Sequence, residues 1–160
     1  MQKENFDTLE VFDSAVFLEV ALDKEKSSEA RSKLHEVKSD PNRLPATTHD
    51  VLGEVNNVLH DQSLFESEYE REQALLNFKR AYDQELIFLL TPRPSKLVKS
   101  MEKVLETDNR IDKHRNDCYI ISKAVCENAD VLYTIGELGW FEGLDRSRKN
   151  LNGVSAPKSF

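Results

Sequence analysis

The stretch Leu9–Leu22, LEVFDSAVFLEVAL, decides the fold class of this chain. Its first four residues form a short apolar run typical of a strand, and from residue 16 the apolar residues recur at helical spacing. Asp13 and Ser14 stand between the two patterns, and both residue types accept hydrogen bonds from the free amides at the start of a helix. The stretch therefore predicts a β-strand that leads through an acidic cap into an α-helix.

The same alternation of strand and helix continues along the chain. The run ELIFLLT at 85–91 is apolar without a break, which is typical of a buried strand in a parallel sheet. In the helix expected at 65–82, the residues expected to be buried are Leu75, Leu76, Phe78 and Ala81. Alternating elements of this kind predict an α/β fold with a mainly parallel sheet. Further strands are expected at 44–47, 130–135 and 153–156, and further helices at 27–38, 51–59, 95–106 and 117–128.

Length and charge narrow the class of protein. The 160 residues are expected to form a single domain over 1–160, with 145–152 as the one candidate linker. No apolar run approaches the roughly 20 residues that cross a membrane, and the acidic start lacks a signal-peptide core. The 22 basic and 29 acidic residues give a net charge of 22 − 29 = −7. This charge excludes a generally basic surface that would attract nucleic acid, so binding of nucleic acid would need local basic patches or metal ions.

The two cysteines favour a cytoplasmic protein. Cys118 and Cys126 fall on one expected helix, about 12 Å apart along its axis, which is too far for a disulfide. Their apolar surroundings predict reduced core thiols, which suit a cytoplasmic location. The four histidines show no ligand spacing, so a zinc site is not expected. The sequence also lacks dinucleotide and phosphate-binding glycine patterns, a Gly-x-Ser-x-Gly elbow, and the second Asp of haloacid-dehalogenase-type phosphatases.

Four acidic residues are expected at the carboxyl ends of the strands, where open parallel sheets bind ligands. Asp13 closes the first strand, and Glu54 lies in the first turns of the helix after the second. Asp117 starts the helix before the strand 130–135, and Glu137 follows that strand. Crowded carboxylates repel one another, and a divalent cation that keeps them ionised can also generate hydroxide for phosphodiester cleavage.

Each acid also has a structural alternative. Asp13 and Asp117 could serve only as helix caps. Glu54 lies beside an apolar stripe, where it is either exposed at the edge or held by a partner.

The order of the segments around these acids resembles the PIN-domain family of metal-dependent ribonucleases, which includes VapC-type toxins. The resemblance runs from about residue 9 to 160, and the individual motifs are short. The segments that carry it, in order, are VFDSAVFLEV, VLGEVNNVL, NDCYIISKA, ADVLYTIGELGWF and GVSAPKSF.

The resemblance implies a three-layer α/β/α sandwich with an acidic pocket at one edge. It implies that Asp13, Glu54 and Asp117 occupy the family's first three acidic positions. Ser14 and Thr134 occupy its small hydroxyl positions, where they would orient a metal ligand or a water. The activity implied is Mg²⁺- or Mn²⁺-dependent cleavage of single-stranded RNA.

One position departs from the family. After the last core strand the family usually has Thr-x-Asp, whereas this chain has Thr134, Ile135 and Gly136. Three arrangements are open: Glu137 substitutes as the fourth acid, Asp112 enters from the other side, or the site has three acids. The departure leaves a second function open, a PIN-fold module that has weakened or lost catalysis and binds RNA or protein.

Partners are expected from the same resemblance and from local charge. Arg110, Lys113 and Arg115 directly precede Asp117 and could contact an RNA backbone, or they could form an ordinary solvated face. A toxin role would require an antitoxin protein as partner, and homodimers are common in the family. Trp140 and Phe141 are either core residues or a stacking surface for a base.

Overall fold

The computed structural model describes residues 3–83, 85–107, 115–135 and 158–159. Within these ranges strands and helices alternate, and two short 3₁₀ turns lie at Lys3–Asn5 and Gln62–Leu64. The strands are β1 (Thr8–Phe12), β2 (Arg43–Thr47), β3 (Phe88–Leu89), β4 (Val131–Thr134) and β5 (Lys158–Ser159). The helices are α1 (Ser14–Ala21), α2 (Ser27–Ser39), α3 (His49–Leu59), α4 (Glu68–Ala81), α5 (Pro94–Thr107) and α6 (Arg115–Cys126).

The described strands form one sheet in the order β3-β2-β1-β4-β5, and every neighbouring pair is parallel. β1 lies in the middle, where Glu10 pairs with Pro45 of β2 and with Val131 of β4. The expected α/β fold with a parallel central sheet is confirmed.

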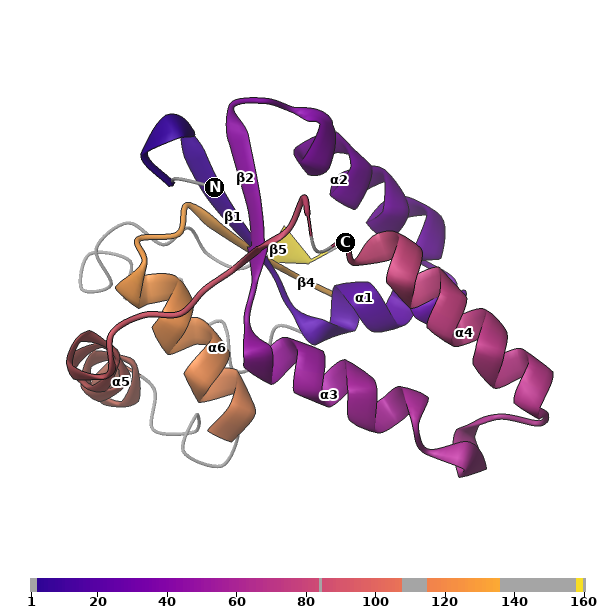
Figure 1. Cartoon of the computed structure of the whole chain (residues 1–160). Helices are drawn as coiled ribbons and strands as arrows, with labels where there is room; N and C mark the ends of the chain where they lie inside the picture. The colour runs from indigo at the N-terminus through magenta and orange to yellow at the C-terminus, as the bar shows by residue number, and fades with distance from the viewer. Residues whose placement is uncertain (1–2, 84, 108–114, 136–157, 160) are drawn as a thin grey trace.

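Helices cover both faces of the sheet, which gives the expected three layers. α5 and α6 lie together on one side of the sheet, whereas α1, α2 and α4 lie on the other (Figure 1). α3 contacts α1, α4 and α6 and follows the carboxyl end of β2.

The core between the sheet and α4 is aromatic. Phe12 of β1 and Phe17 of α1 are fully buried and meet edge to face, with ring centroids 6.4 Å apart. Phe17 also packs edge to face against Phe78 and Tyr82, at 5.9 and 6.2 Å. Aromatic area of this size dominates the burial energy of a small core.

A polar network crosses the same face of the sheet. Glu10, only 3% exposed, accepts two hydrogen bonds from the Arg43 guanidinium, at 2.5 and 2.7 Å, and one from the Tyr133 hydroxyl at 2.6 Å. Thr8 donates to the same carboxylate at 3.0 Å, and Arg43 also pairs with Glu36 at 2.7 Å. The network ties β1 to β2, β4 and α2. Because its charges are paired and hydrogen-bonded, burial of this carboxylate is tolerated.

The opening stretch folds as its pattern predicts. β1 runs to Phe12, Asp13 is the N-cap of α1, and the buried residues of that helix include Val16, Phe17 and Val20. Helices also begin close to the expected positions at Ser27 and His49.

Two predictions about buried faces are only partly right. In the run 85–91 Ile87 and Leu90 are buried as expected, but the strand β3 covers only Phe88 and Leu89, both half-buried, and lies at the edge of the described sheet beside β2. In α4 the expected stripe fails at Leu76, which is 40% exposed, and Ala74 takes the buried place one turn before Phe78. The helix is highly charged and packs through a narrow line of residues, so its apolar side chains do not all face inward.

Several predictions fall outside the described residues. They concern the strand at 153–156, the linker at 145–152, and Trp140 and Phe141. Cys118 and Cys126 both lie on α6 and are not joined in a disulfide, as expected. Among the helices that the structure describes, none is long and apolar enough to cross a bilayer.

Candidate active site

The strand order places a topological switch point at the carboxyl ends of β1 and β4. These strands are neighbours, but the chain proceeds from β1 to β2 on one side and from β4 to β5 on the other. Connections that diverge in this way mark the position where open α/β sheets bind ligands, which is the expected crevice of this fold. Asp13 follows β1 directly, and Thr134 is the last residue of β4.

Asp13 is fixed at this crevice by both strands. Its side chain is 6% exposed, and its backbone amide donates to the Tyr133 carbonyl at 2.9 Å. Oδ1 accepts from the Ser14 amide at 2.8 Å, and Oδ2 accepts from the Thr134 hydroxyl at 2.9 Å. Ser14 Oγ lies 3.4 Å from Oδ1. The carboxylate therefore has a defined orientation although its contacts come from distant parts of the chain.

The electrostatics of Asp13 favour a nearby cation. Burial raises the pKa of its carboxyl, and the hydrogen bonds from Ser14 and Thr134 oppose that rise. The negative charge of Glu54 raises the pKa further, which places the two carboxylates within each other's field. A divalent ion between them would remove the repulsion and offset the cost of burying the charge.

Local sequence explains why Glu54 reaches this edge. The Thr47 hydroxyl donates to the Phe12 carbonyl at 2.9 Å, which fixes the end of β2 beside the end of β1. Thr48 then caps α3 by accepting from the Val51 amide at 3.2 Å. Glu54 follows in the second turn of α3 and is half-buried.

α6 approaches the same edge through an ion pair that the sequence analysis missed. Lys123 Nζ of α6 lies 2.6 Å from Asp50 Oδ2 in the first turn of α3. No local pattern reveals a pair separated by 73 positions. Asp117 is half-buried and lies in the first turn of α6. Its roles as a helix cap and as a metal ligand both stay predictions.

The structure thus brings Asp13, Ser14 and Thr134 into contact and couples Glu54 to them through charge. Within the described ranges, no three His, Cys, Asp or Glu side chains are grouped so that they could hold a metal ion. The joint metal site that includes Asp117 stays a prediction, and Glu137 lies outside those ranges. Mg²⁺ commonly uses only one or two carboxylates and fills its other positions with water or substrate phosphate, so Asp13 and Glu54 fit as donors.

The side chains predicted to contact RNA are not among those that the structure describes. Arg110, Lys113 and the alternative acid Asp112 lie outside the described residues, and of Arg115 only the backbone is described.

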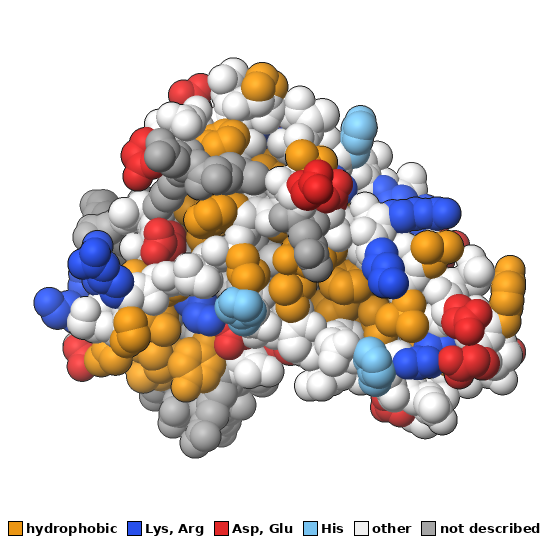
Figure 2. Space-filling model, in the orientation of Figure 1, with side chains coloured by type: hydrophobic (Ala, Val, Ile, Leu, Met, Phe, Trp, Pro, Cys, Tyr) orange, Lys and Arg blue, Asp and Glu red, His pale blue; other side chains and the backbone are white. Residues whose placement is uncertain are grey.

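A separate groove of about 630 Å³ lies between α3 and α4. Figure 2 shows hydrophobic side chains along it, and Leu52, Leu75, Phe78 and Tyr82 belong to its lining. His49 and His60 lie at the two ends of α3 and also line it. The sequence analysis did not find this surface, because it assigned these apolar residues to the core.

The architecture agrees with the fold that the sequence resemblance implies, an α/β/α sandwich. The resemblance to PIN domains itself rests on the sequence segments alone. Comparisons with protein-family models, curated proteins and solved structures find no match to this chain.

Proposed function

We propose that this chain is a PIN-like endoribonuclease that depends on a divalent metal ion. One observation carries the proposal: the buried Asp13 carboxylate is held by Thr134 and Ser14 beside the charge of Glu54, at the carboxyl ends of the neighbouring strands β1 and β4. A carboxylate that is buried, oriented and repelled by a second acid is a common feature of functional sites.

Each side chain has a distinct role in this proposal. Bound Mg²⁺ or Mn²⁺ would supply a hydroxide from water and stabilise negative charge on the phosphodiester. Asp13 and Glu54 are the ligands, with Asp117 and Glu137 as further acids expected from the sequence. Thr134 and Ser14 orient Asp13 through the hydrogen bonds at 2.9 and 2.8 Å, so that its carboxylate is held in one arrangement.

The substrate class is single-stranded RNA, which follows from the resemblance. Arg110, Lys113 and Arg115 would contact the RNA backbone before it reaches the acids. A cytoplasmic location, an antitoxin protein that blocks the crevice and a homodimer belong to the same proposal.

Cleavage of a labelled single-stranded RNA in Mn²⁺ tests the assignment. We expect Asp13→Asn and Glu54→Gln each to slow cleavage by about 100-fold, the usual cost of removing a group that stabilises transition-state charge. Asparagine also caps helices, so Asp13→Asn retains the start of α1. Glu72→Gln on the exposed side of α4 is the matched control and should cleave normally. If Asp13→Asn cleaves RNA as fast as the unmodified chain, the catalytic assignment is wrong.

Gly136 favours a second candidate, a PIN-fold module that binds RNA or protein without cleaving it, because glycine supplies no ligand where the family has an acid. Thermal unfolding in Mn²⁺ separates the two functions. A metal that binds only the folded chain stabilises it by about 2.7 kcal/mol at one hundred times its dissociation constant. A rise in Tm that Asp13→Asn abolishes supports the nuclease, and an unchanged Tm at millimolar Mn²⁺ supports the binding module.

A further inference from the structure

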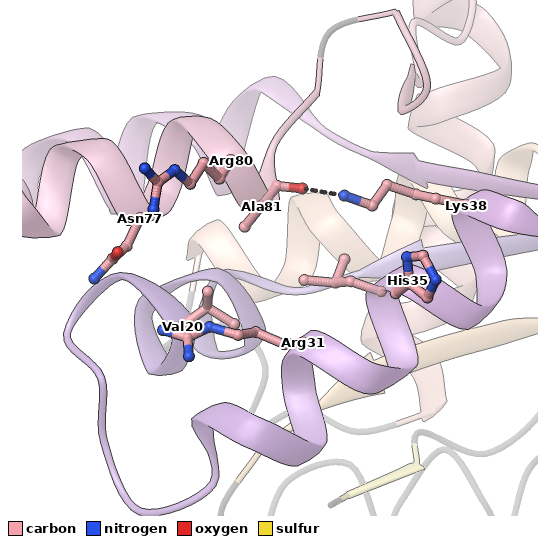
Figure 3. A pocket seen from close by; sticks show the side chains of 8 residues that line it. Val20, Arg31, His35, Lys38, Asn77, Arg80 and Ala81 are labelled. Carbon is pink, nitrogen blue, oxygen red and sulfur yellow. Dashed lines mark hydrogen bonds between the residues drawn. The ribbon is translucent and has the colours of Figure 1, made fainter.

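A basic cavity of about 480 Å³ lies between α2 and α4, away from the candidate active site. α2 ends just before β2 and α4 ends before β3, so the cavity lies toward the amino ends of these strands, opposite Asp13. Its volume is typical of a site for a small molecule. The cavity is lined by Val20, Arg31, Leu34, His35, Lys38, Asn77, Arg80 and Ala81 (Figure 3).

The cavity combines an apolar floor with a basic rim. Val20, Leu34 and Ala81 are buried and form the floor. The rim carries two arginines, a lysine and a histidine, and none of the described lining residues is a carboxylate, in a chain whose net charge is −7. Figure 3 shows that these side chains come from both helices, with Arg80 on α4 and the other three on α2, and Figure 2 shows Lys and Arg side chains over this part of the surface.

Two of the basic groups are already held in place. Lys38 Nζ donates to the Ala81 carbonyl at 3.1 Å, which fixes it at the end of α4. Burial lowers the pKa of Lys38, and the charge of Asp83 opposes that change. Arg31 lies 3.3 Å from Asp23, an exposed pair of small energy that leaves the guanidinium free to accept a second partner.

Arg80 and His35 are the other two basic groups of the rim. In the parts of the chain that the structure describes, the Arg80 guanidinium and the His35 ring make no hydrogen bond or ion pair. Two guanidinium groups on facing helices can bind one phosphate through paired N–H donors, which an ammonium cannot do.

We propose that this cavity binds a small phosphomonoester with an aromatic or apolar body. Its phosphate lies between Arg31 and Arg80, with Lys38 adding positive charge and the His35 ring available as a hydrogen-bonding group, and its body covers the apolar floor. The proposal is independent of the nuclease, because the two sites share no residue.

Calorimetric titration with adenosine 5′-monophosphate, without metal, tests the proposal. We expect Arg31→Gln and Arg80→Gln each to weaken binding about tenfold, since each removes a charged hydrogen-bond donor. Lys79→Gln is the control, because it removes the same charge from the neighbouring position of α4, outside the cavity. Adenosine and inorganic phosphate should both bind more weakly than the monophosphate, since each offers only half of the contacts.

Four results would overturn the proposal. In the first two, the unmodified chain gives no heat of binding, or both arginine variants bind the monophosphate with the same affinity as the control. In the other two, inorganic phosphate binds as tightly as the monophosphate, or the arginine substitutions weaken only the binding of a single-stranded RNA. The last result would assign the basic rim to an RNA backbone instead. Repeating the titration in Asp13→Asn separates the two sites, because that variant should bind the monophosphate normally even though the proposed metal site is disabled.

Discussion

Asp13 has a structural role in the fold in addition to the catalytic role that we propose for it. The sequence offers a helix cap and a metal ligand as alternatives for this residue. In the structure Asp13 caps α1 through Oδ1, while Oδ2 accepts a hydrogen bond from a residue 121 positions away. The cap was predictable because it depends on neighbours in sequence, whereas the bond from Thr134 depends on the packing of β1 against β4.

The raised pKa of Asp13 makes metal binding depend on pH. Because burial raises that pKa, the carboxyl keeps its proton at a pH where an exposed aspartate, with a pKa of about 3.9, is ionised. The protonated form cannot serve as a cation ligand, so the Mn²⁺-induced rise in Tm should grow as the pH increases through the raised pKa. Asp13→Asn should show no such growth. An equal pH response in this variant would assign the titration to another group.

Thr134→Val tests the hydrogen bond to Asp13 with little change in shape. Its hydroxyl lowers the pKa of the buried carboxyl, so its removal should raise that pKa and leave a buried acceptor with one donor fewer. We expect a loss of about 1–3 kcal/mol in the free energy of unfolding at neutral pH, measured in urea. Thr134→Ser keeps the donor and should lose less. If the serine variant loses as much as the valine variant, the methyl group matters more than the hydrogen bond.

At the scale of elements, prediction succeeds where the signal is local. α2 and α3 follow from apolar spacing, and Thr48 caps α3 as its residue type predicts. The run at 85–91 forms a shorter strand than predicted, because the apolar sequence of a segment does not show how many strands will pair with it. With only β2 beside it, most of this run lies outside the ladder, and Leu86 is 45% exposed.

The ion pair between β1 and β2 should make stability fall in acid. Burial alone would raise the pKa of Glu10, but hydrogen bonds from Arg43, Tyr133 and Thr8 outweigh it and lower the pKa. The stabilisation is therefore complete above about pH 4.3, the ordinary glutamate value, and is lost as the pH falls through the lower folded value. Glu10→Gln should cost about 2–3 kcal/mol at neutral pH, because Arg43 keeps only part of its pairing.

Urea unfolding at several pH values measures this difference. The gap between Glu10→Gln and the unmodified chain should close as the pH falls below the ordinary glutamate pKa. Glu29→Gln, at an exposed position in the first turn of α2, is the control and should change stability little at any pH. A gap that stays constant in acid would mean that the effect comes from packing and not from charge.

At the scale of the whole molecule, the strand order lies beyond the sequence signals. Local patterns predict that strands and helices alternate, but β1 joins β4 across more than a hundred positions. The meeting of Asp13 and Thr134 follows from that long-range pairing. The family resemblance implied that Thr134 orients a metal ligand or a water, whereas residue spacing alone could not relate Thr134 to a residue so distant in sequence.

Phe17 connects the layers on one side of the sheet. Its ring contacts Phe12 of the central strand and also Phe78 and Tyr82 at the end of α4. Phe17→Ala should lower the free energy of unfolding by about 3–5 kcal/mol, the usual cost of a large cavity in a core. Tyr69→Ala, at a side chain that is 71% exposed, should change it little. Equal losses in the two variants would contradict a single core centred on Phe17.

The central position of β1 has a consequence for the nascent protein on the ribosome. Of the described strands, β1 is synthesised before the others, and β2 can join it about 35 positions later, but its other edge pairs with β4 only once Val131 has emerged. Non-local pairing of this kind slows folding, and an open apolar edge is prone to associate with other chains. Synthesis that stops before β4 should therefore yield aggregating fragments, and the emergence of β4 should be the step that suppresses this association.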